Sequence, residues 1–324
     1  MRQAGRYMKA YRKIREKHSL MAMFKTPELA AEITLQPVHA FEIDAAIIFA
    51  DILLPLEGMG VGFEFDPGPV IHNPIRTPAD VERLRIPDPE ADLGFVLKSL
   101  RYVRAEIDGK VPLIGFAGAP FTLAGYAIEG GSSSNYLLTR DLMYRHPGAW
   151  DLLMNKFCDT IIAFLKAQVH AGAQVVQLFD SWVGCLSPYD YKSFVLPYSR
   201  RIFQELRKDG ICSIHFGTGT GGLLHLMVEA GGDIVGIDWR VNLDRSWQSI
   251  GSGAGVQGNL DPVALMAPIP ILKQKAAEIL EEAGGRAGHI FNLGHGILPS
   301  TPEDSVKVLT DFVHEYSAGT GAVS

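Results

Sequence analysis

The clearest hydrophobic pattern in the chain is a short run of uncharged, apolar residues at positions 45–50, with Asp44 before it and Asp51 after it. Apolar and polar residues do not alternate within this run. The pattern is typical of a strand that is buried on both faces, as in a parallel sheet covered by helices. Because a carboxylate is costly in the middle of such a strand, we expect Asp51 at the point where the strand emerges.

Asp51 therefore has two interpretations. The carboxyl ends of the strands form the active face of parallel α/β folds, which favours a functional role for this carboxylate. Asp is also common as the first residue of a turn or as a cap, which would make its role purely structural. The hydrophobic pattern alone favours neither interpretation.

Six further apolar segments with the pattern of buried strands follow along the chain. They are 112–117, 174–179, 212–216, 234–238, 255–259 and 289–293. Segments with helical periodicity separate them, which predicts a parallel sheet built from βα units. Nearly every strand ends in Asp, Ser, His or Asn, as is typical of a (β/α)8 barrel. We therefore predict an α/β protein with a single barrel domain over 1–324, in which the eighth strand is not located and 318–324 form a flexible tail.

Local signals place three helices and one irregular region. Thr26 is the predicted cap of a helix that ends near Phe41, because Pro and Glu follow it directly. The segment 77–80 caps a second helix, and a longer helix spans about 150–170. The Gly-rich and Pro-rich segment 55–75 predicts a loop and a short hairpin over one rim of the barrel.

A doubly wound sheet is the competing fold. It would carry a Gly-x-Gly-x-x-Gly motif after the first strand, and the sequence has none there. The nearest segment, 217–222 (GTGTGG), lacks the required spacing. We interpret it as a turn, with a ligand contact as the alternative.

Composition narrows the class of protein. Charged residues are 20% and apolar residues 47% of the 324 residues, and no apolar run is as long as a membrane span. The N-terminus lacks the apolar segment of a secretory signal. The cysteines, Cys158, Cys185 and Cys212, form no CxxC pair, so we expect a reducing cytoplasm and no thiolate zinc site.

Charge is unevenly distributed along the chain, whose net charge is −6. Residues 1–26 contain eight Lys or Arg and one acidic residue, Glu16. This basic arm could bind an anionic ligand or could be a solvated tail. Arg2 and Arg6 would share one face of a helix, but Gly5 makes a loop that presents both equally possible. The rest of the chain lacks basic stripes with interleaved aromatics, so we expect no nucleic-acid partner.

Two longer motifs resemble the signatures of the uroporphyrinogen decarboxylase family, whose members act in haem and chlorophyll biosynthesis. Residues 1–7 (MRQAGRY) resemble the second half of the first signature, and 115–130 resemble the whole of the second. Further matching stretches occur in the family's order at 44–51, 177–181, 236–239, 257–262 and 292–296. The resemblance covers the chain end to end, and it implies a (β/α)8 barrel, a homodimer, and no metal or organic cofactor. The family's first signature begins upstream, whereas this sequence starts at Met1, so we expect a late start assignment or a trimmed end.

The resemblance implies a carboxy-lyase that converts the four acetates of uroporphyrinogen III to methyls and gives coproporphyrinogen III. This substrate is a cyclic tetrapyrrole with eight carboxylates. Arg2 and Arg6 suit it, because guanidinium binds carboxylate bidentately and stays charged. Arg15 matches a further family arginine, although a lone surface cation is its plain interpretation. The other implied substrate contacts are Gln3, Ala4, Gly5, Asp51, Tyr126, Ser181 and His295.

By resemblance, Asp51 faces the pyrrole N–H groups at the centre of the macrocycle. Loss of CO2 from an acetate needs an electron sink, and a pyrrole protonated at carbon supplies one. A fixed carboxylate stabilises that cation, so Asp51 and Arg2 are the predicted catalytic residues. An arginine, water and His295 all remain candidates for the proton donor. Tyr126, Ser181 and His295 also have plain interpretations as a satisfied hydroxyl, a cap and a core histidine.

Two rival functions differ in chemistry. Related cobalamin-dependent methyltransferases hold zinc with a His-x-Cys pair and a distant Cys, whereas this chain has 215–217 (HFG) and His295 at those places. The second rival is a non-catalytic tetrapyrrole carrier. Asp51, Arg2 and Arg6 together exceed what simple anion binding needs, and turnover of uroporphyrinogen separates an enzyme from a carrier.

Overall fold

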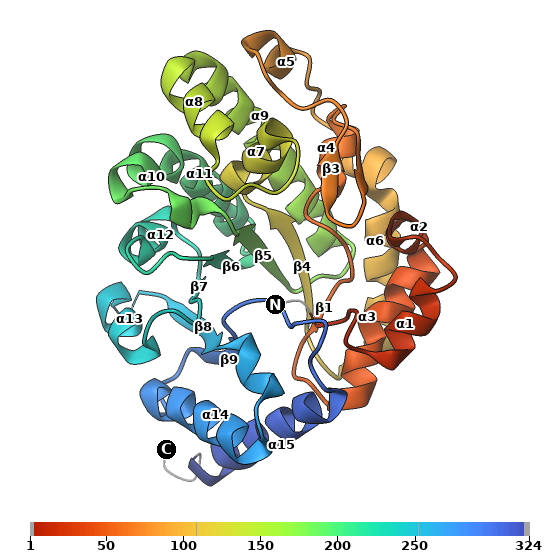
Figure 1. Ribbon diagram of the computed structural model, residues 1–324, viewed down its shortest axis with the longest axis vertical. Helices are drawn as coiled ribbons and strands as arrows, with labels where there is room; N and C mark the ends of the chain where they lie inside the picture. The colour runs from red at the N-terminus through yellow and green to blue at the C-terminus, as the bar shows by residue number, and fades with distance from the viewer. Residues whose placement is uncertain (1–2, 108, 252, 321–324) are drawn as a thin grey trace.

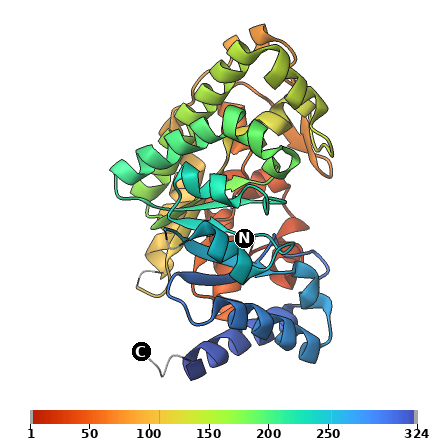
Figure 2. The same cartoon turned by 90° about the vertical axis from the view of Figure 1, so that its left-hand side faces the viewer.

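The computed structural model describes residues 3–107, 109–251 and 253–320, and a curled parallel sheet forms its centre (Figures 1 and 2). Neighbouring strands follow the order β1-β4-β5-β6-β7-β8-β9, and every pair is parallel. The strands are β1 (Ala46–Ile47), β4 (Leu113–Gly118), β5 (Val175–Asp180), β6 (Cys212–Gly217), β7 (Ile234–Gly236), β8 (Gly255–Leu260) and β9 (His289–Leu293).

All seven predicted strands are confirmed, and the fold belongs to the predicted α/β class. The sheet curls as in a barrel, but within the described residues it has seven strands, and β1 and β9 are its two ends and do not pair with each other. The first strand is shorter than the apolar run 45–50. Its ladder with β4 continues to the Ile48 amide. The Phe49 amide points to the opposite edge, as the Ile47 amide does, and donates to the Thr34 hydroxyl at 2.9 Å. A side chain from the covering helix α3 therefore satisfies the edge of the chain just after this strand.

Helices cover the outside of the sheet (Figure 1). Those before β5 are α1 (Lys9–Arg15), α2 (Leu20–Lys25), α3 (Pro27–Phe41), α4 (Leu54–Gly58), α5 (Pro78–Glu82), α6 (Pro89–Ile107), α7 (Pro120–Glu129), α8 (Leu137–Arg145) and α9 (Pro147–His170). Those after β5 are α10 (Pro188–Phe194), α11 (Leu196–Lys208), α12 (Leu224–Ala230), α13 (Leu243–Ile250), α14 (Ile269–Ala283) and α15 (Glu303–Thr320), with 3-10 turns η1 (Val183–Cys185) and η2 (Pro262–Met266).

Two groups of buried apolar side chains hold these layers together. The larger group fills the space between the sheet and helices from α2 to α14, with Phe121, Trp150 and Phe157 among its fully buried members. The smaller group includes Tyr7 and Tyr11 and joins the N-terminal segment to α14 and α15. The described part of the basic arm therefore packs against the rest of the protein along one side. It does not form a freely solvated tail.

Most of the local predictions are confirmed. Helix α3 begins after Thr26 as predicted, but the Thr26 side chain makes no capping hydrogen bond. Thr77 and Asp80 form a reciprocal capping box at the start of α5. The region 55–75 contains the predicted hairpin, β2 (Phe63–Phe65) with β3 (Pro69–Ile71), and also part of the unpredicted short helix α4.

Three further features bear on the sequence predictions. The segment 217–222 leaves β6 as a turn, as expected. The predicted tail begins at 318, whereas α15 extends to Thr320 and residues 321–324 lie outside the described part. Among the described residues, no helix has the length and apolar character needed to cross a membrane.

Candidate active site

One side chain fastens the start of the described chain to the edge of β1. Gln3 Nε2 donates to the Ala45 carbonyl at 2.8 Å, and Gln3 Oε1 accepts from the Ile47 N–H at 2.9 Å. The amides of Ala46 and Ile48 point the other way and donate to carbonyls on and beside β4. The Gln3 amide therefore satisfies the open edge of β1 as a neighbouring strand would.

Two further contacts fix the turn that follows Gln3. The Tyr7 hydroxyl donates to the Gln3 carbonyl at 2.7 Å, and burial raises the pKa of this phenol above its usual value, so it stays a donor. Arg12 Nη1 donates to the carbonyls of Arg6 and Tyr7 at 2.9 and 2.8 Å. Residues 3–8 form a loop, which confirms the loop alternative for this part of the segment.

The predicted substrate residues of this segment differ in exposure. Residues 4–5 are buried, whereas Arg6 and Arg15 are exposed. Arg15 Nη1 donates to the His18 carbonyl at 2.9 Å, so part of its guanidinium is bound to its own chain. Arg2, the other predicted catalytic residue, lies outside the described residues.

Asp51 follows β1 and is half-buried. Its Oδ1 accepts a hydrogen bond from the Leu53 N–H at 2.9 Å, directly before α4 begins at Leu54. Asp51 therefore makes the turn contact that the structural interpretation expects, and its functional role stays a prediction. This bond occupies one oxygen position of a carboxylate that can accept several hydrogen bonds, so it is compatible with a second role.

Tyr126 and Ser181 lie near each other through contacts of α7 with the turn after β5. Thr122, one helical turn before Tyr126, donates from its hydroxyl to Asp180 Oδ1 at 3.0 Å and accepts from the Trp182 N–H at 3.3 Å. The ring of Tyr126 meets the Trp182 ring edge-on, with 5.8 Å between centroids. Helix α7 therefore holds the turn on both sides of Ser181, which is half-buried.

His295 lies two residues after β9 and packs against the loop that follows β7. Its ring meets Trp239 edge-on, with 5.7 Å between the centroids. A Cβ on Gly294 would lie 2.3 Å from the Trp239 backbone nitrogen, so only glycine permits this approach. The glycine beside His295 thus permits a close contact between two loops at the rim.

The described site residues all lie near the carboxyl ends of the sheet strands. Asp51 follows β1, Tyr126 lies on the helix after β4, Ser181 follows β5, and His295 follows β9. Since all seven strands are parallel, their carboxyl ends meet at this edge, where barrel enzymes carry their active sites.

Comparison with known proteins decides the family. The family model described as uroporphyrinogen decarboxylase (URO-D) matches residues 1–316. The uroporphyrinogen decarboxylase of Carboxydothermus hydrogenoformans is 57% identical over 98% of this chain and 91% of its own length. That of Sorangium cellulosum is 57% identical over 97% of this chain and 90% of its own length. The chain belongs to the uroporphyrinogen decarboxylase family.

Solved structures agree with a barrel fold for this uroporphyrinogen decarboxylase family member. A methyltransferase from Methanosarcina mazei superposes with a TM-score of 0.76 at 20% sequence identity. The match covers 90% of this chain and 86% of the methyltransferase. At this identity the likeness concerns the fold and not the chemistry.

The methyltransferase rival needs a thiolate site, so the positions of the cysteines matter. Cys212 lies at the start of β6 and His215 in its middle, while burial raises the pKa of Cys185 to about 11 and that of Cys158 to about 12. Both thiols are therefore protonated near neutral pH. Among the described residues, no three His, Cys, Asp or Glu side chains are grouped as metal ligands.

The pattern of strands did not reveal two polar features of this rim. Asp180 and His215 are fully buried on neighbouring strands, with 4.0 Å between Asp180 Oδ2 and His215 Nε2. On the rim itself, the buried carboxylate of Asp238 accepts from the Gly219 N–H and from Arg240. The sequence signal was a polar residue within or directly after each apolar run, but His215 and Gly219, which contact Asp180 and Asp238, are distant from them in sequence.

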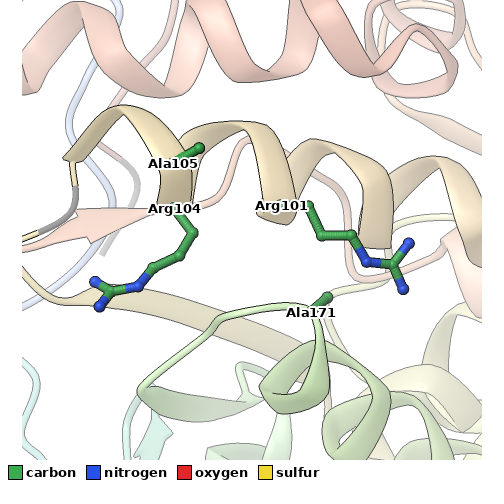
Figure 3. A pocket seen from close by; sticks show the side chains of 4 residues that line it. All are labelled: Arg101, Arg104, Ala105 and Ala171. Carbon is green, nitrogen blue, oxygen red and sulfur yellow. The ribbon is translucent and has the colours of Figure 1, made fainter.

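A hollow of about 480 Å3 lies at the other end of the strands, near their amino ends. Figure 3 shows Arg101 and Arg104 extending from α6 on either side of Ala171, which precedes β5. Arg101 donates to Glu90 and Arg104 donates to Gln174, each through one guanidinium nitrogen. This hollow is remote from the strand ends that carry the predicted site, and its cations are bound to neighbouring side chains.

Proposed function

We propose that this chain is a uroporphyrinogen decarboxylase, which removes the four acetate carboxylates of uroporphyrinogen III as CO2 and yields coproporphyrinogen III in porphyrin and haem biosynthesis. The observation that carries the proposal is the family match over residues 1–316, with 57% identity to relatives of that name. The position of Asp51, Tyr126, Ser181 and His295 at one edge of a parallel sheet supports it.

Each decarboxylation exchanges one CO2 for one proton. A pyrrole ring that gains a proton at carbon becomes a cation, and the electron pair of the breaking C–C bond flows into it. A second proton on the new methylene then gives the methyl group, while the ring proton is lost, so each acetate consumes one proton overall. The substrate acts as its own electron sink, and the step as written uses no added cofactor.

Asp51 is the proposed partner of the pyrrole cation. Its carboxylate is fixed by the bond from the Leu53 N–H and lies at the end of a strand whose other edge is held by Gln3. A carboxylate fixed in advance stabilises a developing positive charge without the reorganisation that solvent would need. In this proposal the N–H groups of the four pyrroles face this one acceptor.

The basic N-terminal segment is the proposed site for the substrate carboxylates. Arg6 is exposed on a loop whose backbone is held by Gln3, Tyr7 and Arg12, so its guanidinium starts from a fixed backbone. Arg2 and Arg15 complete the proposed set of cations. Tyr126, Ser181 and His295 are proposed to contact the substrate from the strand ends.

A homodimer and a cytoplasmic location complete the proposal. The dimer rests on the family resemblance, and the location rests on three cysteines without a pairing pattern. Sedimentation velocity at several protein concentrations measures the assembly: a species of twice the chain mass is expected, and a monomer at all concentrations would contradict the dimer.

Turnover tests the function directly. Purified protein is incubated with uroporphyrinogen III without oxygen, and the products are separated by their number of carboxylates. Intermediates with seven, six and five carboxylates and a final product with four are expected. A protein that binds uroporphyrinogen and leaves it unchanged would be a carrier, and the enzymatic proposal would fail.

A further inference from the structure

The loop after β7 presents an arginine at the rim of the proposed site. Asp238, buried with 1% of its side chain exposed, accepts from the Arg240 N–H at 3.0 Å and from Arg240 Nη1 at 2.8 Å. It also accepts from the Gly219 N–H. The Arg240 side chain itself is 49% exposed. One guanidinium nitrogen therefore binds a buried carboxylate while half of the side chain reaches solvent.

An aromatic ring fixes the plane of this guanidinium. The Arg240 guanidinium carbon lies 3.8 Å from the centre of the Trp239 ring, the distance of a stacked cation–π contact. Trp239 in turn meets His295, a proposed substrate contact, edge-on at 5.7 Å. Arg240 is therefore held rigidly and is separated from His295 by one aromatic ring.

The loop that carries Arg240 is held from three directions. Asn259 Nδ2 donates to the carbonyls of Asp238 and Val241 at 2.9 and 2.7 Å. Gly294 packs against the Trp239 backbone, and Gly219 comes from the loop after β6. The loop therefore has little freedom to move, which reduces the entropy lost when a ligand binds.

The remaining donors of Arg240 match a carboxylate. Within the described residues, no hydrogen bond from its Nε or Nη2 to a protein acceptor is found, and Asp238 already receives two backbone N–H bonds besides Nη1. Guanidinium binds carboxylate through two parallel N–H bonds. The Nε and Nη2 groups of Arg240 can therefore donate to a second carboxylate.

We propose that Arg240 is a further substrate-binding residue, whose guanidinium binds one carboxylate of the substrate at the rim beside His295. The proposal rests on the proposed function, because it assumes a polycarboxylate ligand in the barrel mouth. The alternative is that Arg240 serves only to neutralise buried Asp238. The two roles differ in what a lysine does: Lys keeps the charge for Asp238 but lacks the bidentate fork.

Arg240→Lys and Arg240→Gln test this proposal, with Arg286→Lys as a matched control. Arg286 also stacks on a tryptophan, with its guanidinium carbon 4.3 Å from the centre of the Trp247 ring, but it donates to the carbonyls of Glu282 and Ala283 at the end of α14. For both Arg240 variants we expect KM for uroporphyrinogen III to rise about tenfold while kcat changes by about twofold or less. Arg286→Lys should leave both constants unchanged.

A binding measurement separates this inference from the proposed function. The dissociation constant of coproporphyrinogen III is measured by tryptophan fluorescence on the full chain and both variants, whether or not the protein turns over substrate. Weaker binding in both variants with unchanged urea midpoints supports a substrate contact. Unchanged KM and unchanged product affinity in a folded Arg240→Lys would overturn it, and so would unfolding of both variants, which would make the role of Arg240 structural. Absence of turnover by the wild type contradicts the proposed function instead.

Discussion

Gln3 and Ile47 are joined by a hydrogen bond that takes the place of a strand neighbour. Gln3 Oε1 accepts from the Ile47 N–H at 2.9 Å, and the same amide donates to the Ala45 carbonyl at 2.8 Å. Both backbone groups lie on the edge of β1 that faces away from β4. The N-terminal loop therefore satisfies the open edge of the sheet and at the same time gains a fixed position over the proposed site.

Gln3→Ala is expected to lower both stability and substrate affinity. The change leaves one backbone donor and one acceptor on β1 without partners, which costs about 1–3 kcal/mol of the free energy of unfolding. The released loop should also raise KM. Urea unfolding and steady-state kinetics measure the two effects, with Gln248→Ala on the exposed side of α13 as the control. A Gln3→Ala variant as stable as the control would contradict this role.

Arg6→Lys tests the proposed carboxylate clamp. Lys keeps the positive charge but cannot form the bidentate fork, so kcat/KM should fall about tenfold or more. Arg145→Lys is the control, because Arg145 is an exposed arginine paired with Asp141 at 2.7 Å on the surface of α8. An Arg6→Lys enzyme with the kcat/KM of the control would leave Arg6 a surface charge.

Thr122→Val tests the contacts of α7 with the residues on either side of Ser181. Val has nearly the same shape but cannot donate to Asp180 or accept from the Trp182 N–H. Because Thr122 and Asp180 are fully buried, the free energy of unfolding should fall by about 1–3 kcal/mol. Thr310→Val is the matched control, since its hydroxyl donates only to a carbonyl of its own helix. Equal unfolding midpoints for the two variants would show that the Asp180 contact contributes nothing.

The hydrophobic pattern of the sequence predicts the order and position of all seven sheet strands. The prediction succeeds because strands buried on both faces are apolar throughout, whereas the covering helices have apolar residues at helical spacing. The pattern overestimates the length of β1, which pairs with β4 only at Ala46 and Ile47, and Thr34 on a different element accepts from the Phe49 amide at the other edge. The predicted cap at Thr26 fails in detail, since the residue has the right position but no side-chain bond.

The candidate site is predicted from sequence only where a motif carries it. Asp51 directly follows an apolar run, and Ser181 and His295 each lie two residues after one, so the strand prediction places them at the strand ends and the family motifs single them out. The role of Gln3 depends on a contact across 44 residues, and that of Arg240 depends on the loops after β6 and β9 and on Asn259 within β8. Local periodicity contains no information on such contacts, because they are set by how the strands are arranged around the barrel.

His289 makes stability dependent on pH. Burial lowers the pKa of this imidazole below its usual 6.5, the charge of Arg286 adds to the effect, and the hydrogen bond with the Gly258 carbonyl opposes it. At His289 the unfolded chain therefore binds a proton more readily than the folded chain does. This contribution to stability is present above about pH 6.5 and is lost as the pH falls through the folded pKa.

His289→Gln removes this titration and keeps a donor for the Gly258 carbonyl. Urea midpoints are measured for both proteins between about pH 7.5 and 5. The wild type should lose more stability across this range than the variant. Parallel midpoint curves for the two proteins would rule out His289 as a source of the pH dependence.

The proposed mechanism places a specific demand on Asp51. Its Oδ1 accepts from the Leu53 N–H at 2.9 Å, and Asn at this position retains an equivalent acceptor. Asp51→Asn therefore keeps the bond that forms the turn and removes the negative charge. Asp51→Ala removes the acceptor as well and should cost about 1 kcal/mol of stability, as the loss of a cap does.

The kcat of Asp51→Asn, measured on protein whose urea midpoint is also determined, is the most direct test of the account. If the carboxylate stabilises a pyrrole cation, kcat should fall on the order of 100-fold or more, the size of effect seen when one preorganised electrostatic partner is lost. The urea midpoint should stay that of the wild type, and the affinity for coproporphyrinogen III should change less than kcat. A stable Asp51→Asn protein with the kcat of the wild type would contradict the catalytic role of Asp51.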